Sequence, residues 1–197
     1  MTEKEKMLSQ MLYDSGSDPD LIRERLHAKE LCFEYNHLHP SDEEGRRKIL
    51  ERLLGRVRKN CCITAPFWCD YGYNIEMGDH FFSNYNLIIL DCAKVSFGDN
   101  VMIAPGCGFH TAGHPIDFQR RNKNLEFAYP IHVGSNVWIG AGVQVTPGVT
   151  IGNNVVIGAG SVVVKDIPDN CVAFGNPCRA IRKITESDQR TCWDRRR

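Results

Sequence analysis

The second half of the chain carries a large aliphatic residue at every sixth position, without a break over six repeats. The residues of this ladder are Val133, Ile139, Val145, Ile151, Ile157 and Val163. An α-helix repeats at about 3.6 residues and a flat strand at about 2, so neither produces a strict period of six. Such a period is typical of a parallel β-helix, in which each short strand turns one aliphatic side chain inward. The sequence therefore predicts a mainly β fold, built as a stack of coils.

Small residues follow the ladder at the places where such a chain must bend. Glycine follows four of the six aliphatic positions, and Thr146 and Val164 follow the other two. Glycine adopts the positive φ angles that tight bends require, and asparagine tolerates them next best. The pairs Ser135-Asn136 and Asn153-Asn154 stand directly behind two of these glycines. We expect all of these positions to lie at the corners of the coils.

Upstream, from about residue 61, the same period is present in a ragged form. The register that includes Ile89-Leu90 is displaced by two residues from the register that includes Phe97-Gly98. An irregular coil or a small bulge at Asp91 to Lys94 would account for the displacement. The period is then lost between residues 110 and 130, where charged and polar residues dominate. A loop of this length inside a compact repeat is usually functional or disordered.

The first 60 residues have helical periodicity instead. Apolar residues at positions 7, 8, 11 and 12 share one helix face. Asp18-Pro19 predicts the start of a second helix, Ser41-Asp42-Glu43-Glu44 predicts a capping box for a third, and Gly55 is suited to end it. We therefore divide the chain into a helical segment (1–60), a β-helix domain (61–183) with an inserted loop (110–130), and a C-terminal tail (184–197).

Charge and composition exclude several classes of protein. The chain has 197 residues, with 24 basic and 24 acidic side chains, so no global field attracts nucleic acid. No signal peptide opens the chain, and no apolar run reaches the roughly 20 residues of a membrane helix. We expect a soluble, cytoplasmic protein. The nine cysteines are an odd number without a secretory signal, so we expect reduced thiols rather than a disulfide framework.

His114 is the first candidate for chemistry. It lies near the start of the inserted loop between Gly113 and Pro115, where a rigid coil would hold it at one accessible place. An imidazole titrates near neutral pH and can serve as a general base. Cys107, His110 and His114 match no common zinc-ligand spacing, and we expect no metal site. The chain also lacks the Gly-x-Ser-x-Gly, Cys-x-x-Cys and phosphate-loop motifs of other enzyme classes.

Several motifs together are specific enough to identify a family. They are Cys69-Asp70-Tyr71-Gly72-Tyr73-Asn74-Ile75, Phe82-Ser83-Asn84-Tyr85-Asn86, Gly98-Asp99-Asn100-Val101, Ala104-Pro105-Gly106, His114-Pro115-Ile116-Asp117, Asn136-Val137-Trp138-Ile139-Gly140 and Gly175-Asn176-Pro177. On these motifs the chain resembles the maltose O-acetyltransferase group, within the galactoside/maltose branch of the hexapeptide-repeat acetyltransferases. The resemblance extends from about residue 3 to residue 183.

The resemblance implies a left-handed parallel β-helix that assembles as a homotrimer, with active sites between neighbouring subunits. It also implies acetyl-CoA as co-substrate and a sugar hydroxyl as acceptor. His114 matches the catalytic histidine of the family. The positions that match acceptor-side residues are Asp14, Arg25, Asp70, Asn84 and Asp91, and those that match the coenzyme groove are Trp138, Ala141, Ala159, Val164, Lys165, Arg179 and Arg182.

Two departures from the galactoside members bear on the acceptor. Those members have a second acidic residue directly after the position of Asp91, where this chain has Cys92. They also have a serine where this chain has Asp70. Maltose-type members resemble this chain at both places. The resemblance therefore implies glucose, maltose or a related glucoside as acceptor, rather than a thiogalactoside.

The reaction implied by the resemblance is a direct transfer without an acyl-enzyme. Nε2 of His114 would take the proton of a sugar hydroxyl while the oxygen attacks the thioester. Nδ1 must be fixed by a hydrogen bond, either to a backbone carbonyl or to a carboxylate such as Glu126. Backbone N–H groups near Ala141 would stabilise the oxyanion.

Three other interpretations remain open. The same chemistry could act on another small alcohol, such as a galactoside or an antibiotic. A metal-dependent hydratase like the γ-class carbonic anhydrases would need three converging histidines, and His80, His110, His114 and His132 are available without that family's spacing. A β-helix can also be a non-catalytic assembly module. The sequence leaves open the physiological acceptor, the acetylated hydroxyl and any assembly beyond a trimer.

Overall fold

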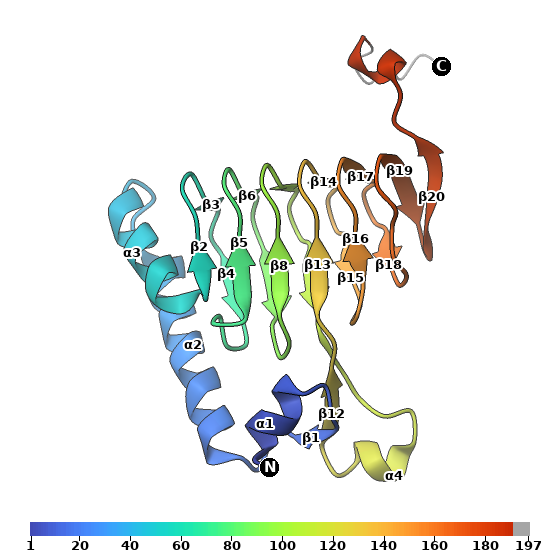
Figure 1. Ribbon diagram of the computed structural model, residues 1–197. Helices are drawn as coiled ribbons and strands as arrows, with labels where there is room; N and C mark the ends of the chain where they lie inside the picture. Colours follow the sequence, from blue (N-terminus) through green and yellow to red (C-terminus); the bar gives the residue numbers. More distant parts are fainter. Residues whose placement is uncertain (191–197) are drawn as a thin grey trace.

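The computed structural model describes residues 1–190, and its body is a stack of coils that forms three parallel sheets (Figure 1). The first sheet contains β2 (Arg56–Val57), β5 (Ile75–Met77), β8 (Val95–Phe97), β13 (Ile131–Val133) and β16 (Thr150–Ile151). The second contains β3 (Cys62–Ile63), β6 (Phe82–Ser83), β9 (Met102–Ile103), β14 (Trp138–Ile139), β17 (Val155–Ile157), β19 (Cys171–Gly175) and the antiparallel β20 (Cys178–Lys183). The third contains β4 (Phe67–Cys69), β7 (Leu87–Leu90), β10 (Gly108–His110), β15 (Gln144–Val145) and β18 (Val162–Val163).

The aliphatic ladder fills the interior of this stack. All six of its residues, from Val133 to Val163, are at most 4% exposed. Each strand pairs in parallel with the strand one coil further on, so equivalent positions stack, as Val145 does on Val163. Burying an aliphatic side chain of this size contributes about 1.5–3 kcal/mol. The predicted mainly β fold, a parallel β-helix, is confirmed.

The two-residue displacement comes from the length of one corner. Trp138 pairs with Val156, eighteen residues later, whereas Phe82 pairs with Met102, twenty residues later. The extra residues lie where the chain turns from the third sheet to the first, and the insertion leaves the stack at the same edge. We call this edge the variable corner: residues 70–74, 91–94, 111–130, 146–149 and 164–166. Of the two accounts considered, an irregular coil with a longer turn explains the displacement, rather than a bulge.

The corner between the first and second sheets is regular. Each of six successive coils has one residue there with φ between 52° and 59°; these are Asn60, His80, Asn100, Asn136, Asn154 and Asn170. Asparagine tolerates this left-handed conformation better than most residues. Beside it a side-chain oxygen accepts a backbone N–H of the neighbouring coil, as Asn153 Oδ1 does from Ser135 at 2.9 Å. This repeated contact gives the asparagine pairs a structural role.

Helices cover one end of the stack (Figure 1). These are α2 (Pro19–His37) and α3 (Glu43–Leu53), whereas the short α1 (Glu3–Leu8) lies beside the stack, next to the insertion. Asp18 caps α2 through two backbone N–H groups, as predicted. The cap of α3 is Asp42 rather than Ser41, because the Ser41 hydroxyl contacts the ring of His39 instead. The strand β2 lies within the stretch assigned to the helical segment, so the stack begins at Arg56.

The insertion is a folded element rather than an irregular loop. It contains β11 (Ala112–Gly113), α4 (Phe118–Arg121) and β12 (Leu125–Ala128). β12 pairs antiparallel with β11 and also with β1 (Tyr13–Asp14) of the N-terminal segment. A small second core lies beneath this sheet, and its buried residues are Met7, Tyr13, Leu21, Tyr71, Cys92, Ala93 and Ala128. The N-terminal segment and the insertion therefore fold against each other at the variable corner.

The other end of the stack carries the β19–β20 hairpin and the short 3-10 helix η1 (Glu186–Gln189) (Figure 1). Eight cysteines lie within the described residues and all have free thiols. Cys192 and the end of the predicted tail, from residue 191, lie outside the described residues. Between residues 1 and 190, no helix has both the length and the apolar character needed to cross a membrane.

Candidate functional site

His114 stands directly after β11, on the insertion at the variable corner. Its Nδ1 lies 3.1 Å from the backbone carbonyl oxygen of Leu125. A carbonyl oxygen only accepts hydrogen bonds, so Nδ1 carries the hydrogen and Nε2 keeps its lone pair. The side chain is about half exposed. Of the two partners considered for Nδ1, the backbone carbonyl is the one that the structure contains.

Glu126 faces the other nitrogen of the ring. Its Oε1 lies 4.0 Å from Nε2 of His114, which is beyond hydrogen-bond distance. The Tyr13 hydroxyl donates to Oε2 at 2.8 Å, and the Ser15 hydroxyl donates to Oε1 at 2.7 Å. The register of β1 on β12 sets Tyr13 directly opposite Glu126. Two hydroxyls of the N-terminal segment thus fix the carboxylate beside the imidazole.

Asp70 adds a second carboxylate at the same corner. Burial raises its pKa, and the hydrogen bond from the Cys92 thiol and the positive charge of Arg25 only partly offset this effect. The thiol of Cys92 donates to Oδ2 of Asp70 at 3.5 Å. The negative charge of Glu126 also raises the pKa of Asp70. Asp70, Arg25, His114 and Glu126 form a polar group that we call the corner cluster.

Asp91 lies beneath the corner cluster and does not reach the surface. It is fully buried. Its Oδ1 accepts the backbone N–H groups of Asp70 at 3.0 Å and Tyr71 at 2.8 Å, and its Oδ2 accepts that of Asn74 at 3.3 Å. Burial raises the pKa of Asp91 to about 6. These contacts give Asp91 the role of organising the turn at residues 70–74 below the site.

Arg25 and Asp14 reach the variable corner from the N-terminal segment. Arg25 donates from Nη1 to the Tyr71 hydroxyl at 2.6 Å and from Nη2 to the carbonyl oxygen of Ser15. Asp14 instead closes a local turn, because its Oδ1 accepts the backbone N–H of Gly16 at 2.9 Å. Arg25 therefore connects α2 to the variable corner, while Asp14 shapes the turn that holds Ser15.

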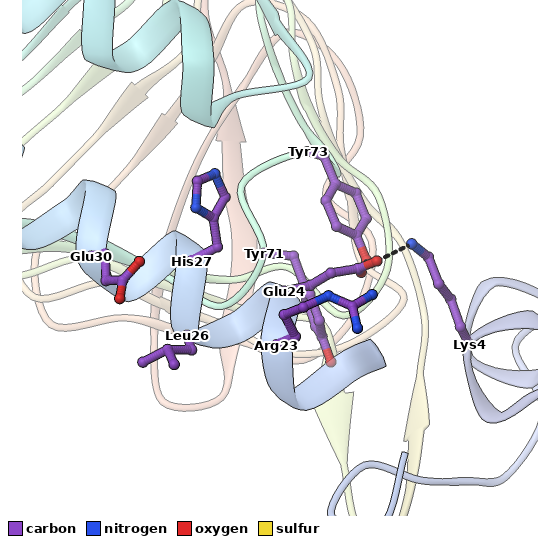
Figure 2. Close-up of a pocket in the computed structure, with 8 residues that line it drawn as sticks. All are labelled: Lys4, Arg23, Glu24, Leu26, His27, Glu30, Tyr71 and Tyr73. Atoms are coloured by element: carbon purple, nitrogen blue, oxygen red, sulfur yellow. Dashed lines mark hydrogen bonds and ion pairs between the residues drawn. The ribbon is translucent and has the colours of Figure 1, made fainter. Parts of the chain in front are cut away.

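A pocket of about 480 Å³ adjoins the cluster between α1, α2 and the turn at residues 70–74 (Figure 2). At one side of it Lys4 pairs with Glu24 at 2.6 Å, with its ammonium 4.9 Å from the centre of the Tyr73 ring. The Tyr73 hydroxyl donates to the same Glu24 at 2.8 Å. The contacts among Lys4, Glu24 and Tyr73 tie α1 and α2 to the turn that carries Asp70.

Asn84, Ala141 and Ala159 lie at a different edge, the second corner, between the second and third sheets. Parallel pairing sets residues 85, 105, 141 and 159 in one column. The N–H of Tyr85 bonds to Oδ1 of Asn84, and Pro105 has no N–H. Among residues 1–190, the N–H groups of Ala141 and Ala159 have no hydrogen-bond partner. Two free amide donors therefore stand one coil apart on exposed residues.

The remaining coenzyme candidates are spread over three places. Trp138 projects, half exposed, from the second sheet, whereas Val164 and Lys165 lie at the variable corner. Arg179 and Arg182 lie on β20. Arg182 is held by Asp188 through two contacts of 2.8 Å. In one chain the third sheet separates the second corner from the variable corner, so Asn84 and His114 do not meet.

The outer faces of the sheets differ in character. The second and third sheets expose large apolar side chains, among them Trp68, Phe82, Ile88, Met102 and Trp138. The first sheet is polar, and on it Glu76 pairs with Arg56 at 2.9 Å and with Lys94 at 2.8 Å. Contiguous apolar surface on a folded chain typically marks a contact with another molecule.

Sequence reasoning missed three residues that hold the cluster: Tyr13, Ser15 and Tyr71. Tyr13 reaches Glu126 only because β1 pairs with β12, and a strand of two residues leaves no periodic signal. Tyr71 lies in a turn whose extra length falls outside the six-residue pattern. Within the part of the chain that the structure describes, no three His, Cys, Asp or Glu side chains are grouped to hold a metal ion.

Two family models match the chain. The maltose acetyltransferase hexapeptide capping motif matches residues 6–58, and the bacterial transferase hexapeptide (six repeats) model matches residues 130–165. A protein of Saccharomyces cerevisiae named "Putative acetyltransferase" is 54% identical over 91% of this chain and 92% of its own. A protein of the same name from Staphylococcus aureus strain Mu50 is 51% identical over 93% of this chain and 92% of its own.

Solved structures agree with the sequence comparison. A maltose O-acetyltransferase from Clostridium difficile 630 has a TM-score of 0.92 and 53% identity, over 94% of this chain and 99% of that one. A galactoside acetyltransferase in complex with coenzyme A has a TM-score of 0.93 and 42% identity, over 96% of this chain and 94% of that one. A hexapeptide-repeat acetyltransferase from Vibrio cholerae, complexed with acetyl-coenzyme A, has a TM-score of 0.85 and 37% identity, over 94% of this chain and 100% of that one. The predicted resemblance is confirmed, and the chain belongs to the maltose and galactoside O-acetyltransferase family.

Proposed function

We propose that this acetyltransferase moves an acetyl group from acetyl-CoA to a hydroxyl of a glucose- or maltose-type sugar. The observation that carries the proposal is His114, whose side chain is half exposed and whose hydrogen-bonded Nδ1 leaves a lone pair on Nε2. Glu126 lies 4.0 Å from this nitrogen, and Asp70 and Arg25 add charged groups that sugar hydroxyls bind at the same corner. The similar maltose O-acetyltransferase and the coenzyme A complex of galactoside acetyltransferase support the choice of acceptor and donor.

The transfer consists of one addition and one elimination. Nε2 of His114 takes the proton of the sugar hydroxyl as its oxygen bonds to the thioester carbonyl carbon. The carbonyl electrons move to oxygen, and when they return the C–S bond breaks. The imidazolium then gives its proton to the departing thiolate, so acetylated sugar and free coenzyme A leave. His114 ends the cycle neutral, without an acyl-enzyme.

The second corner is suited to the coenzyme. The free N–H groups of Ala141 and Ala159 can donate to amide oxygens of the pantetheine arm or to the oxyanion. Trp138 offers an exposed aromatic face nearby, on the sheet next to this corner. Lys165 and Arg179 are cations that can meet phosphate. Arg182 could do so only by leaving Asp188 or by sharing it.

We propose that the protein assembles as a homotrimer. His114 and Asn84 lie at opposite edges of the third sheet, so one chain holds only half of the expected site. The apolar outer faces of the second and third sheets meet at the second corner, and packing them against another copy would bury them. Such packing would bring the second corner of one subunit to the variable corner of the next. Both halves of the site would then face one cleft.

The test follows thiol release from acetyl-CoA with glucose, maltose, methyl galactoside, serine and chloramphenicol as acceptors. We expect glucose or maltose to give the highest kcat/KM. His114→Ala should lower turnover roughly 10²- to 10⁴-fold, the usual contribution of a general base. His132→Ala is the matched control, because that ring lies on the first sheet and contacts Ser96. Activity on serine or chloramphenicol alone, or a His114→Ala variant with normal turnover, would overturn the proposal.

A further inference from the structure

Two hydrogen-bond acceptors face each other at the centre of the corner cluster. Nε2 of His114 has a lone pair, because Nδ1 donates to Leu125. Oε1 of Glu126 lies 4.0 Å away from it. Two acceptors at this separation cannot bond to each other, and each is satisfied only by a donor from outside the pair.

Glu126 has acceptor capacity to spare. An ionised carboxylate has about four lone-pair sites. Within residues 1–190, Glu126 accepts one hydrogen bond on each oxygen, from Tyr13 and from Ser15. Its side chain is 19% exposed, while that of His114 is 51% exposed, so the pair opens toward solvent. The hydroxyls of Tyr13 and Ser15, which the pairing of β1 with β12 brings to Glu126, hold the carboxylate in this orientation.

We propose that Glu126 binds a second hydroxyl of the acceptor while His114 takes the proton of the first. The preferred substrate would then be a polyol with two hydroxyls separated by two or three carbon atoms along the chain or ring. A compact diol of this kind can donate one hydrogen to each acceptor across the 4.0 Å gap, whereas a single alcohol satisfies only one. The inference rests on the proposed sugar acetylation and adds a specificity-determining residue to it.

The charge of Glu126 also matches the course of the reaction. His114 becomes positive when it takes the proton, and the carboxylate then faces an imidazolium at 4.0 Å. A carboxylate bound to the substrate can thus hold the diol before transfer and stabilise the charged ring during it. Truncating Glu126 should therefore affect diols more than acceptors with one hydroxyl.

The experiment is a monodeoxy scan of the acceptor. Methyl glucoside and its 2-, 3-, 4- and 6-deoxy analogues are compared by kcat/KM with wild type and Glu126→Ala. One deletion should abolish transfer, because it removes the attacked hydroxyl. One further deletion should cost the wild type roughly 10- to 100-fold, as expected for a hydrogen bond to a charged group. The same deletion should cost Glu126→Ala less than about twofold, because its partner is already gone.

Controls separate this role from a structural one. Glu126→Gln keeps the shape of the side chain and should lie between wild type and Glu126→Ala. Glu76→Gln makes the same change on the polar first sheet and should match wild type with every analogue. The inference, but not the proposed function, would be overturned if Glu126→Ala lowered kcat/KM equally for all analogues. The same would follow if the wild type showed no second sensitive position. Wild type without thiol release on any sugar would instead overturn the proposed function and this inference with it.

Discussion

The carboxylate of Asp91 accepts the backbone N–H of Tyr71 at 2.8 Å, across the variable corner from one coil to the next. It also accepts the N–H groups of Asp70 and Asn74, so one buried side chain holds the whole turn beneath the corner cluster. This turn carries Asp70 and the hydroxyl that Arg25 contacts. The turn beneath the corner cluster is therefore held by a carboxylate that is itself fully buried.

We expect stability to fall as pH rises through the titration of Asp91. Burial raises its pKa to about 6 from an ordinary value of 3.8. Between these values the native state holds a proton that the unfolded chain has released, so the stabilisation is complete at low pH and is lost as pH rises through about 6. The loss from pH 5 to pH 7 should be about 1 kcal/mol. Urea unfolding at pH 5, 6 and 7 measures it.

Asp91→Asn provides the reference, because it removes the titrating group and leaves every histidine in place. The difference in unfolding free energy between wild type and variant should change with pH over this window. Burial also raises the pKa of Asp70, so its titration lowers the unfolding free energy as pH rises in both proteins. A difference that stays constant from pH 5 to pH 7 would show that Asp91 does not titrate there.

The sequence pattern predicts the interior of the stack far better than its irregular edge. The ladder from Val133 to Val163 repeats because each coil has the same three strands, so a local pattern carries the fold. His114 could be found as the histidine where that pattern breaks. Tyr13 and Glu126 are 113 residues apart and meet through strands too short to leave a period. The burial of Asp91 also depends on the added turn length, which no repeat predicts.

Ala141→Pro should weaken the use of acetyl-CoA without weakening the fold. Pro105 occupies the equivalent place one coil earlier, and the next residue has nearly the same φ in both coils, 74° at Gly106 and 71° at Gly142. Proline therefore fits this corner and removes only the free N–H of Ala141. Losing one such hydrogen bond should lower kcat/KM for acetyl-CoA roughly 2- to 10-fold. Initial rates at varied acetyl-CoA measure the effect, beside the melting temperature.

Pro105→Ala is the control for that change. It adds an N–H to the same column on the preceding coil, where the expected coenzyme positions Ala141 and Ala159 do not lie. We expect its kcat/KM for acetyl-CoA to equal that of wild type. An unchanged kcat/KM in Ala141→Pro, with the fold intact, would exclude the Ala141 amide from coenzyme binding.

His80→Asn should stabilise the protein. His80 is the one residue other than asparagine among the six described positive-φ positions of the corner between the first and second sheets, with φ 56°. A side chain with Cβ costs about 1–2 kcal/mol in this conformation, and asparagine reduces that cost through local hydrogen bonds. We expect a gain below about 1 kcal/mol, read as a higher urea midpoint. His80→Ala, which keeps Cβ without the amide, should show no gain.

Gly98→Ala should destabilise the stack through a clash between neighbouring coils. A Cβ built on Gly98 would lie 2.8 Å from the backbone carbon of Gly134 and 2.5 Å from Oγ of Ser135. Backbone cannot move aside as a flexible side chain can, so the coils must separate at a cost of about 1–3 kcal/mol. Gly16→Ala is the control, because its added Cβ meets its nearest atom at an ordinary 3.5 Å. We expect thermal unfolding at fixed protein concentration to show a lower midpoint for Gly98→Ala and an unchanged one for Gly16→Ala. Equal midpoints for the two variants would mean that the spacing of the coils does not require glycine at position 98.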